Sequence, residues 1–173
     1  MASIIKANQL QDFGGNSILT SDGSGNVTVN ADGLKNTPAV LATKTADQSI
    51  AHNTNTQVSF DTPDIDTNNA FSSNTFTVPA GEGGMYSISA RASMQGIDAG
   101  EFIQLRIYVN DVSSSFFENR QTAYTTDVEF KFSGTFSLNL SAGDTIKYYV
   151  FQNSGDAQNL STPGLYIFKM IGA

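Results

Sequence analysis

Residues 126–140 read TDVEFKFSGTFSLNL, and this segment decides the fold class. From Val128 to Leu140 its even positions carry apolar side chains or glycine, and its odd positions carry polar ones. Side chains of a β-strand point alternately to opposite faces of a sheet, whereas those of a helix repeat about every 3.6 residues. The period of two therefore predicts a long β-strand with one buried face and one exposed face.

The same alternation occurs in two segments that precede this one. Apolar side chains occupy every second position in both: Tyr86, Ile88, Ala90, Ala92 and Met94 in the first, and Ile103, Leu105, Ile107 and Val109 in the second. Turn-forming residues stand at short intervals: Asp61-Thr62-Pro63-Asp64, Pro79-Ala80-Gly81, Asp98-Ala99-Gly100, Asn110-Asp111, Ala142-Gly143-Asp144 and Thr162-Pro163-Gly164. Half-buried strands with this punctuation predict an all-β, antiparallel sandwich or jelly roll.

The composition excludes several classes of protein. The chain has 173 residues, no cysteine and one histidine, so it lacks a disulfide framework, a thiolate nucleophile and the imidazoles of most catalytic metal sites. Its formal net charge is −7 and no basic stripe is present, which argues against nucleic-acid binding. The apolar runs fall far short of the roughly 20 residues that span a bilayer. We expect one domain with a short appendage, no enzyme activity and no cofactor.

The last two predicted strands are apolar on both faces. A second set of large side chains opposes the inward set in each: Tyr149 and Phe151 in the first, and Tyr166, Phe168 and Met170 in the second. A sandwich strand needs only one apolar face, so the second set requires a cover. We expect an oligomer interface there. The alternative is that loops of the same chain cap these strands.

Residues 1–36 are predicted to form a separate segment. Their apolar residues come in short pairs, such as Ile4-Ile5 and Ile18-Leu19, between glycine-containing turns. This apolar mass is too small for an independent core. We expect either a flexible arm or a strand-rich stalk that becomes ordered against copies of itself or against another surface. The second unit then spans residues 37–173.

From Pro38 to Ala173 the sequence resembles the C1q/TNF-like jelly-roll superfamily. Its most informative motif, residues 74–89, is similar to the family's Phe-Thr-x-Pro-x-x-Gly-x-Tyr-x-Phe-Ser signature, and further motifs follow the family's order at residues 38–42, 57–61, 69–71, 105–110, 136–146 and 164–172. The resemblance implies a ten-strand jelly roll that assembles as a tight trimer, with aromatic side chains of the inner sheet at the three-fold axis. This interpretation assigns five residues to the trimer interface: Tyr149, Phe151, Tyr166, Phe168 and Met170. The absence of a collagen-like tract and of a signal peptide argues against a secreted animal complement or cytokine protein.

Residues 3–10 and 15–27 resemble the start of tailed-phage virion proteins, in which the start attaches to the particle and a trimeric β knob projects. The resemblance implies that attachment to other virion proteins uses Ile4, Ile5, Leu10, Ile18 and Leu19. We therefore expect a non-enzymatic, homotrimeric structural protein located in the virion, as a tail fibre, a capsid fibre or a capsid decoration protein. The alternative is an adhesin-like module whose main task is host attachment through a surface glycan or protein.

One loop gathers carboxylates of the kind that calcium prefers, namely Asp61, Asp64 and Asp66. Aligned as an EF-hand loop from Asp64, it has Asn69 where glycine is required and Thr75 where a bidentate glutamate is required. A solvated turn is therefore the favoured alternative to a calcium site.

The region near residues 113–124 combines aromatic side chains and an arginine with small polar residues, as recognition surfaces do. Its candidate contact residues are Tyr108, Phe116, Phe117, Arg120 and Tyr124. In the alternative interpretation, Phe116 and Phe117 begin another strand, with one side chain inward and one at the trimer seam. The residues leave both interpretations open.

Overall fold

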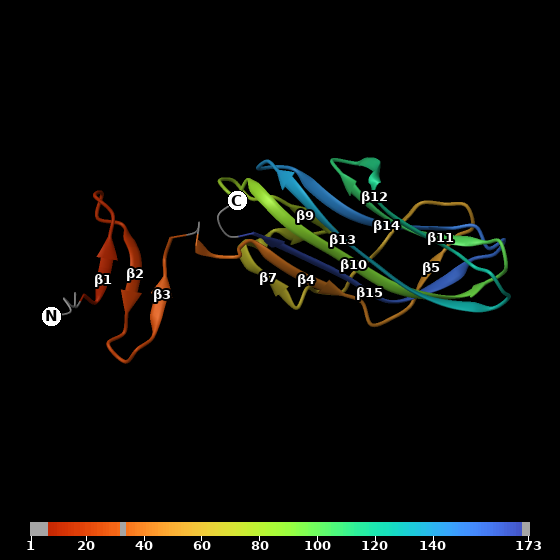
Figure 1. The fold of residues 1–173 in the computed structure, drawn as a ribbon, viewed down its shortest axis with the longest axis horizontal. Helices are drawn as coiled ribbons and strands as arrows, with labels where there is room; N and C mark the ends of the chain where they lie inside the picture. Colours follow the sequence, from red (N-terminus) through yellow and green to blue (C-terminus); the bar gives the residue numbers. More distant parts are fainter. Residues whose placement is uncertain (1–6, 32–33, 171–173) are drawn as a thin grey trace.

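The computed structural model describes residues 7–31 and 34–170, which form a small sheet and a larger sandwich (Figure 1). The small sheet contains β1 (Gln9–Gln11), β2 (Ser17–Ser21) and β3 (Val27–Val29), paired antiparallel in the order β1-β2-β3. It stands apart from the sandwich along the long axis of the molecule (Figure 1). The sandwich begins at β4 (Ala39–Thr43).

The sandwich consists of two six-stranded antiparallel sheets. The first, called the β10 sheet here, has the order β13 (Val128–Leu140), β10 (Gly84–Ile97), β15 (Gln158–Lys169), β4 (Ala39–Thr43) and β7 (Ile65–Asp66), with β5 (Gln48–Ile50) also on β15. The second, called the β11 sheet, has the order β12 (Val112–Thr122), β11 (Phe102–Val109), β14 (Thr145–Gln152), β9 (Thr75–Thr77) and β8 (Phe71–Ser72), with β6 (Thr56–Gln57) also on β14. A single turn of 3-10 helix, η2 (Thr67–Asn69), joins β7 to β8. This architecture confirms the prediction of an all-β antiparallel sandwich.

The core lies between the two sheets and follows the predicted alternation. The inward side chains of β10 are buried, from Tyr86 to Met94, and Ile103, Leu105 and Ile107 of β11 are fully buried opposite them. The segment that predicted the fold is β13, which places Phe132 and Leu140 in the core. Each large apolar side chain removed from water in this way contributes about 2 kcal/mol to the free energy of unfolding. The two-residue period thus becomes one continuous core.

The Thr162-Pro163-Gly164 segment, predicted as a turn, lies inside β15. The register shifts there, because Arg91 of β10 pairs with Gly164 whereas Ser93 pairs with Ser161. Two residues of β15 therefore oppose one residue of β10, which is a β-bulge. A bulge accommodates proline, which has no N–H for the ladder. The turn prediction was wrong because the strand continues beyond the bulge.

The outward side chains of the last two strands lie on different sheets. Tyr149 and Phe151 point outward from β14 in the β11 sheet, and Tyr166 and Phe168 point outward from β15 in the β10 sheet. Met170 follows the end of β15. The two groups are thus on opposite faces of the sandwich, with the whole core between them. The prediction that all five residues line one three-fold axis is therefore corrected, because opposite faces cannot meet at a single axis.

Candidate functional site

Two ends of the sandwich help to place the candidate sites. We call the end at which β4 begins and β15 ends the near end, because it faces the small sheet, and we call the opposite end the far end (Figure 1). Because β10 and β15 both run the length of the β10 sheet, the outer face of this sheet extends from one end to the other. The near end of this face is apolar and its far end is polar.

The apolar part of this face is formed by the end of β15. Phe168 and Met170 are each 41% exposed, which is unusual for large apolar side chains on a sheet whose other face is already in a core. Tyr166 lies one step farther along the same face, and the Arg91 guanidinium stands 5.8 Å from the centre of its ring. These contiguous side chains form the candidate assembly surface of the protein.

An ion pair lies beside this surface and is largely withdrawn from water. Lys169 Nζ stands 3.1 Å from Glu82 Oε2, and the two side chains are only 13% and 12% exposed. The Tyr86 hydroxyl donates a 2.6 Å hydrogen bond to the Glu82 backbone carbonyl. Burial, together with the nearby Glu82 charge, raises the pKa of Tyr86 to about 12. The ion pair therefore anchors the end of β15, the strand that carries the assembly surface.

The outer face of the β11 sheet carries a different arrangement, a ladder of aromatic and guanidinium groups. The Arg120 guanidinium lies 3.6 Å from the centre of the Phe102 ring. Phe102 stacks on Phe151, with 5.7 Å between the two ring centres. The Arg106 guanidinium lies 5.0 Å from the centre of the Phe151 ring, and the ring centres of Tyr108 and Tyr149 are 4.2 Å apart. These contacts satisfy the aromatic faces within one chain.

Polar contacts hold this ladder together. Arg106 Nε lies 3.4 Å from Glu118 Oε1, and Arg106 also donates to Gln104 Oε1 at 2.6 Å and to Asn55. Gln104 in turn donates to Glu118. Tyr149 and Phe151 are therefore half-buried under side chains of neighbouring strands. Tyr149 and Phe151 are therefore covered by side chains of their own chain, as the alternative prediction stated. The covering side chains come from neighbouring strands and not from loops.

The structure separates the five residues predicted as a recognition surface. Tyr108 and Arg120 belong to the ladder, whereas Tyr124, which follows β12, is 95% exposed. Phe117 packs edge-on against Phe136 at 5.9 Å and faces the core, so its assignment to a recognition surface is corrected. The side chain of Phe116 lies outside the described residues. The alternation of β12 explains this result, because successive side chains of a strand face opposite ways.

The three carboxylates predicted as calcium candidates each serve a different local hydrogen bond. Asp61 accepts from the backbone N–H and the hydroxyl of Thr45, which lowers the pKa of Asp61. Asp64 accepts from Thr43, and Asp66 accepts from the backbone N–H groups of Ala70 and Phe71: these are bonds that shape the loop. Within residues 7–31 and 34–170, no group of three metal-ligating side chains could hold an ion. The described residues therefore give no support to the calcium alternative, and the three carboxylates act as local hydrogen-bond acceptors.

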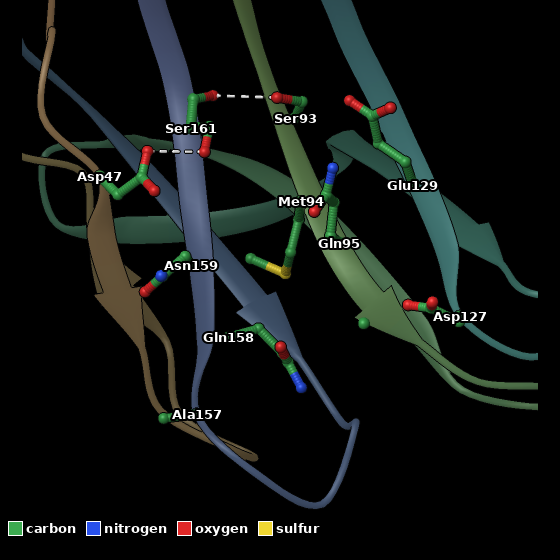
Figure 2. Close-up of a pocket in the computed structure, with 11 residues that line it drawn as sticks. Asp47, Ser93, Met94, Gln95, Asp127, Glu129, Ala157, Gln158, Asn159 and Ser161 are labelled. Carbon is green, nitrogen blue, oxygen red and sulfur yellow. Dashed lines mark hydrogen bonds between the residues drawn. The ribbon is translucent and has the colours of Figure 1, made fainter.

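A polar hollow of about 470 Å³ lies on the outer face of the β10 sheet toward its far end (Figure 2). Its lining includes Asp47 before β5, Ser93 on β10, Glu129 on β13 and Ser161 on β15. Ser161 donates a 2.6 Å hydrogen bond to Asp47, and Ser93 donates to the Ser161 backbone carbonyl at 3.4 Å. Figure 2 shows these three residues in a row across two strands. The sequence carried no sign of this row, because Asp47 and Ser161 are far apart in the chain.

The residues predicted for particle attachment lie in or before the small sheet. Leu10 of β1 pairs with Leu19 of β2, which pairs with Val29 of β3, and Leu10 is 54% exposed. Ile18 is half-buried in β2. Ile4 and Ile5 lie outside the described residues. Leu10 and Leu19 thus lie on one face of the small sheet, and Ile18 lies on the opposite face.

Comparison with known proteins identifies the fold. No protein-family model and no curated protein matches the sequence. The globular domain of zebrafish complement 1qA protein superposes with a TM-score of 0.59 at 20% identity, over 77% of this chain and 97% of that chain. Murine APRIL at pH 5.0 superposes with a TM-score of 0.56 at 13% identity, over 76% of this chain and 98% of that chain. The sandwich therefore has the C1q/TNF-like jelly-roll fold, which confirms the fold that the sequence motifs implied.

No helix in the described part of the chain is long and apolar enough to cross a membrane. The single histidine has a structural contact, since His52 Nδ1 accepts a 2.8 Å hydrogen bond from the Gly155 backbone N–H. Its ring therefore fastens the loop after β14.

Proposed function

We propose that this chain is a non-enzymatic structural protein of a tailed-phage virion, which assembles as a trimer of jelly-roll knobs and attaches to the particle through its N-terminal segment. The observation that carries the proposal is the apolar surface at the near end of the β10 sheet. There, Phe168 and Met170 lie exposed on a sheet whose opposite face is already buried. A second copy of the chain provides the cover that such a surface requires.

The C1q/TNF-like fold supports the trimer, since the sequence resemblance implied three jelly rolls meeting through an inner sheet. The β10 sheet is the better candidate for that sheet. Within the described residues its Phe168 and Met170 remain 41% exposed, whereas Phe102 and Phe151 of the β11 sheet stack with arginines of their own chain. The trimer would place the three near ends side by side, and with them the three small sheets. Weak contacts made by one copy would then be multiplied by three.

The small sheet supports the attachment role. Its three strands are too short to enclose a core, and Leu10 and Val27 remain largely exposed. Residues 3–10 and 15–27 also carry the resemblance to the start of tailed-phage virion proteins. A segment of this kind gains stability when a partner surface covers it, which suits attachment to another virion protein.

Light scattering on the purified chain tests the trimer. We expect three times the chain mass at micromolar concentration, and we expect Phe168→Asp to shift the protein toward monomer because it places a charge in the apolar surface. Val112→Asp is the matched control, because Val112 is an exposed apolar residue on the β11 sheet. A monomeric parent chain, or equal dissociation by both variants, would refute the proposed surface.

Immunogold labelling of phage particles tests the location. Label on the tail or on the capsid would identify which of the two carries the protein. Particles that contain the genome and all other structural proteins but no label would refute the virion assignment.

A second function, host attachment through a glycan or protein, is favoured by one observation. Tyr124 is 95% exposed on the loop that follows β12, where it has the freedom to contact a partner. A glycan array probed with the full-length protein tests this role. Binding that Tyr124→Ala abolishes would favour host attachment, and the absence of any bound glycan would count against it.

A further inference from the structure

We propose that Asp47 of one copy contacts Lys131 and Arg91 of the next copy, and that this charged contact sets the register of the three knobs. The inference rests on the proposed trimer and names the polar residues that would orient it. It concerns the far half of the β10 sheet, where the apolar surface has ended.

Lys131 and Asp47 lie at opposite ends of one row of the sheet. Lys131 of β13 pairs with Ser93 of β10, and Ser93 pairs with Ser161 of β15. The Ser161 hydroxyl then donates to Asp47, which stands beyond β15 (Figure 2). Neighbouring strands are about 4.8 Å apart, so β13 and β15 are separated by about 10 Å. The row therefore has a cation at one side of the face and an anion at the other, at the same level along the strands.

These charges are poorly compensated within one chain. The Lys131 side chain is 79% exposed, and its ion pair with Glu129 is long, at 3.9 Å. Arg91 stacks near Tyr166 but forms no ion pair with any residue that the structure describes. Asp47 accepts a hydrogen bond from a neutral hydroxyl. Both signs of charge are thus free to attract a partner.

A three-fold ring brings such charges together. In a ring each interface joins two different patches of the same chain, so one side of a copy meets the other side of its neighbour. The side of the row with Lys131, next to which Arg91 lies on the adjoining row of β10, would then face the side with Asp47. Glu129 and Asp127 also line the hollow and oppose this contact in part, but Lys131 is the more exposed member of its ion pair, at 79% against 43% for Glu129.

The contact would act on register and specificity more than on bulk affinity. An exposed ion pair is weak, yet like charges in the same place disfavour a wrong alignment. Three identical contacts per trimer multiply the effect of one substitution. The apolar surface at the near end would provide most of the affinity between copies. The charged row would fix the angle at which one knob is rotated relative to the next.

Charge reversal on the full-length chain tests the proposal. Light scattering over a dilution series gives the concentration at which half of the chains are trimeric. We expect this concentration to rise about tenfold for Lys131→Glu and for Asp47→Lys, since each creates three like-charge contacts per trimer. The double variant, Lys131→Glu with Asp47→Lys, restores opposite charges and should return to within about twofold of the parent. High salt should reduce all of these differences.

Two variants control for a change of charge elsewhere on the knob. Asp156→Lys alters the far-end loop, and Val112→Lys adds a charge to an exposed position of the β11 sheet; neither should change the midpoint concentration. Thermal unfolding of every variant verifies that it is folded.

The outcomes separate the two proposals. A monomeric parent chain would overturn the proposed trimer and this inference together. A trimeric parent whose midpoint concentration is unaffected by the single variants would overturn the inference and leave the trimer standing. A double variant that dissociates as readily as either single variant would do the same.

Discussion

The buried side-chain amide of Gln152 donates a 2.9 Å hydrogen bond to the backbone carbonyl of Ile50, 102 residues away in the chain. Gln152 ends β14 of the β11 sheet and Ile50 ends β5 of the β10 sheet, so this bond joins the two sheets at the far end. The same amide donates to the Asp156 carbonyl at 2.8 Å, and its oxygen accepts from the Ser154 backbone N–H at 2.6 Å. One side chain thus organises the loop that borders the polar hollow.

Replacing Gln152 with leucine should lower the free energy of unfolding by about 3 kcal/mol. The change leaves buried backbone groups without partners, and each such group costs about 1–3 kcal/mol. Urea unfolding measures the loss. Gln95→Leu is the matched control, because Gln95 is exposed on β10, and it should change stability by less than about 0.5 kcal/mol. Equal effects of the two variants would contradict the role of Gln152.

Replacing Tyr148 with phenylalanine should make the protein more stable. Its side chain is fully buried, and its hydroxyl has no hydrogen-bond partner among the described residues. Removing an unpaired buried hydroxyl should raise the free energy of unfolding by about 1 kcal/mol. Tyr86→Phe is the contrasting variant: it loses the hydrogen bond to the Glu82 carbonyl and should be destabilised by about 1 kcal/mol. Destabilisation by Tyr148→Phe would mean that the hydroxyl is paired.

Alkaline pH should weaken the fold through the same tyrosines. Burial raises the pKa of Tyr148 above the ordinary value of 10.0, and the pKa of Tyr86 is raised to about 12. Above pH 10 the unfolded chain releases these protons while the folded chain keeps them, so the free energy of unfolding falls as pH rises. Urea unfolding at several pH values should show a smaller fall for Tyr148→Phe than for the parent. Parallel curves would refute this assignment.

The ion pair between Glu82 and Lys169 should be costly to break from one side. Glu82→Gln leaves the largely buried Lys169 ammonium without a counter-ion, and we expect a loss of about 2 kcal/mol. Adding Lys169→Met should recover part of that loss, because no unpaired charge then remains. Glu129→Gln is the control, since its pair with Lys131 is exposed and should be worth less than about 0.5 kcal/mol. Calorimetry on the parent, Glu82→Gln, the double variant and Glu129→Gln checks this order of stability. A double variant that is less stable than Glu82→Gln would contradict it.

A chain that begins at Thr37 should keep the sandwich intact. The core residues of the sandwich all lie between Val40 and Ile167, and the small sheet contributes none of them. The thermal midpoint of the shortened chain, measured at equal trimer content, should lie within about 2 °C of the parent value, because a loss of 1 kcal/mol would shift it by about 2–4 °C. A larger drop would show that the small sheet stabilises the sandwich.

Much of the fold could be predicted from local patterns. The alternation in β10, β11 and β13 identified their buried faces, because the period of a strand is set by backbone geometry alone, and their polar second face indicated antiparallel pairing. Thr162-Pro163-Gly164 misled the prediction because proline and glycine punctuate turns and bulges alike. Only the pairing partner of a strand distinguishes the two.

The candidate sites were less predictable, because they depend on which strands are neighbours. The sequence identified Tyr149, Phe151, Tyr166 and Phe168 as outward side chains but could not assign them to sheets. The stacking of Arg106 on Phe151 and of Arg120 on Phe102 depends on the order β12-β11-β14. The bond from Ser161 to Asp47 joins residues 114 positions apart.

The sequence by itself determined that this protein is an antiparallel β-sandwich with a short, separate N-terminal segment and few groups suited to catalysis. Those properties follow from residue type and two-residue spacing, which act locally along the chain. The tertiary structure alone decided that the two aromatic groups lie on opposite faces, that one is covered by its own arginines, and that Phe168 and Met170 remain exposed. The physical reason is that alternation along a strand shows only which side chains share a face. The order and register of the strands decide which neighbouring side chains contact that face.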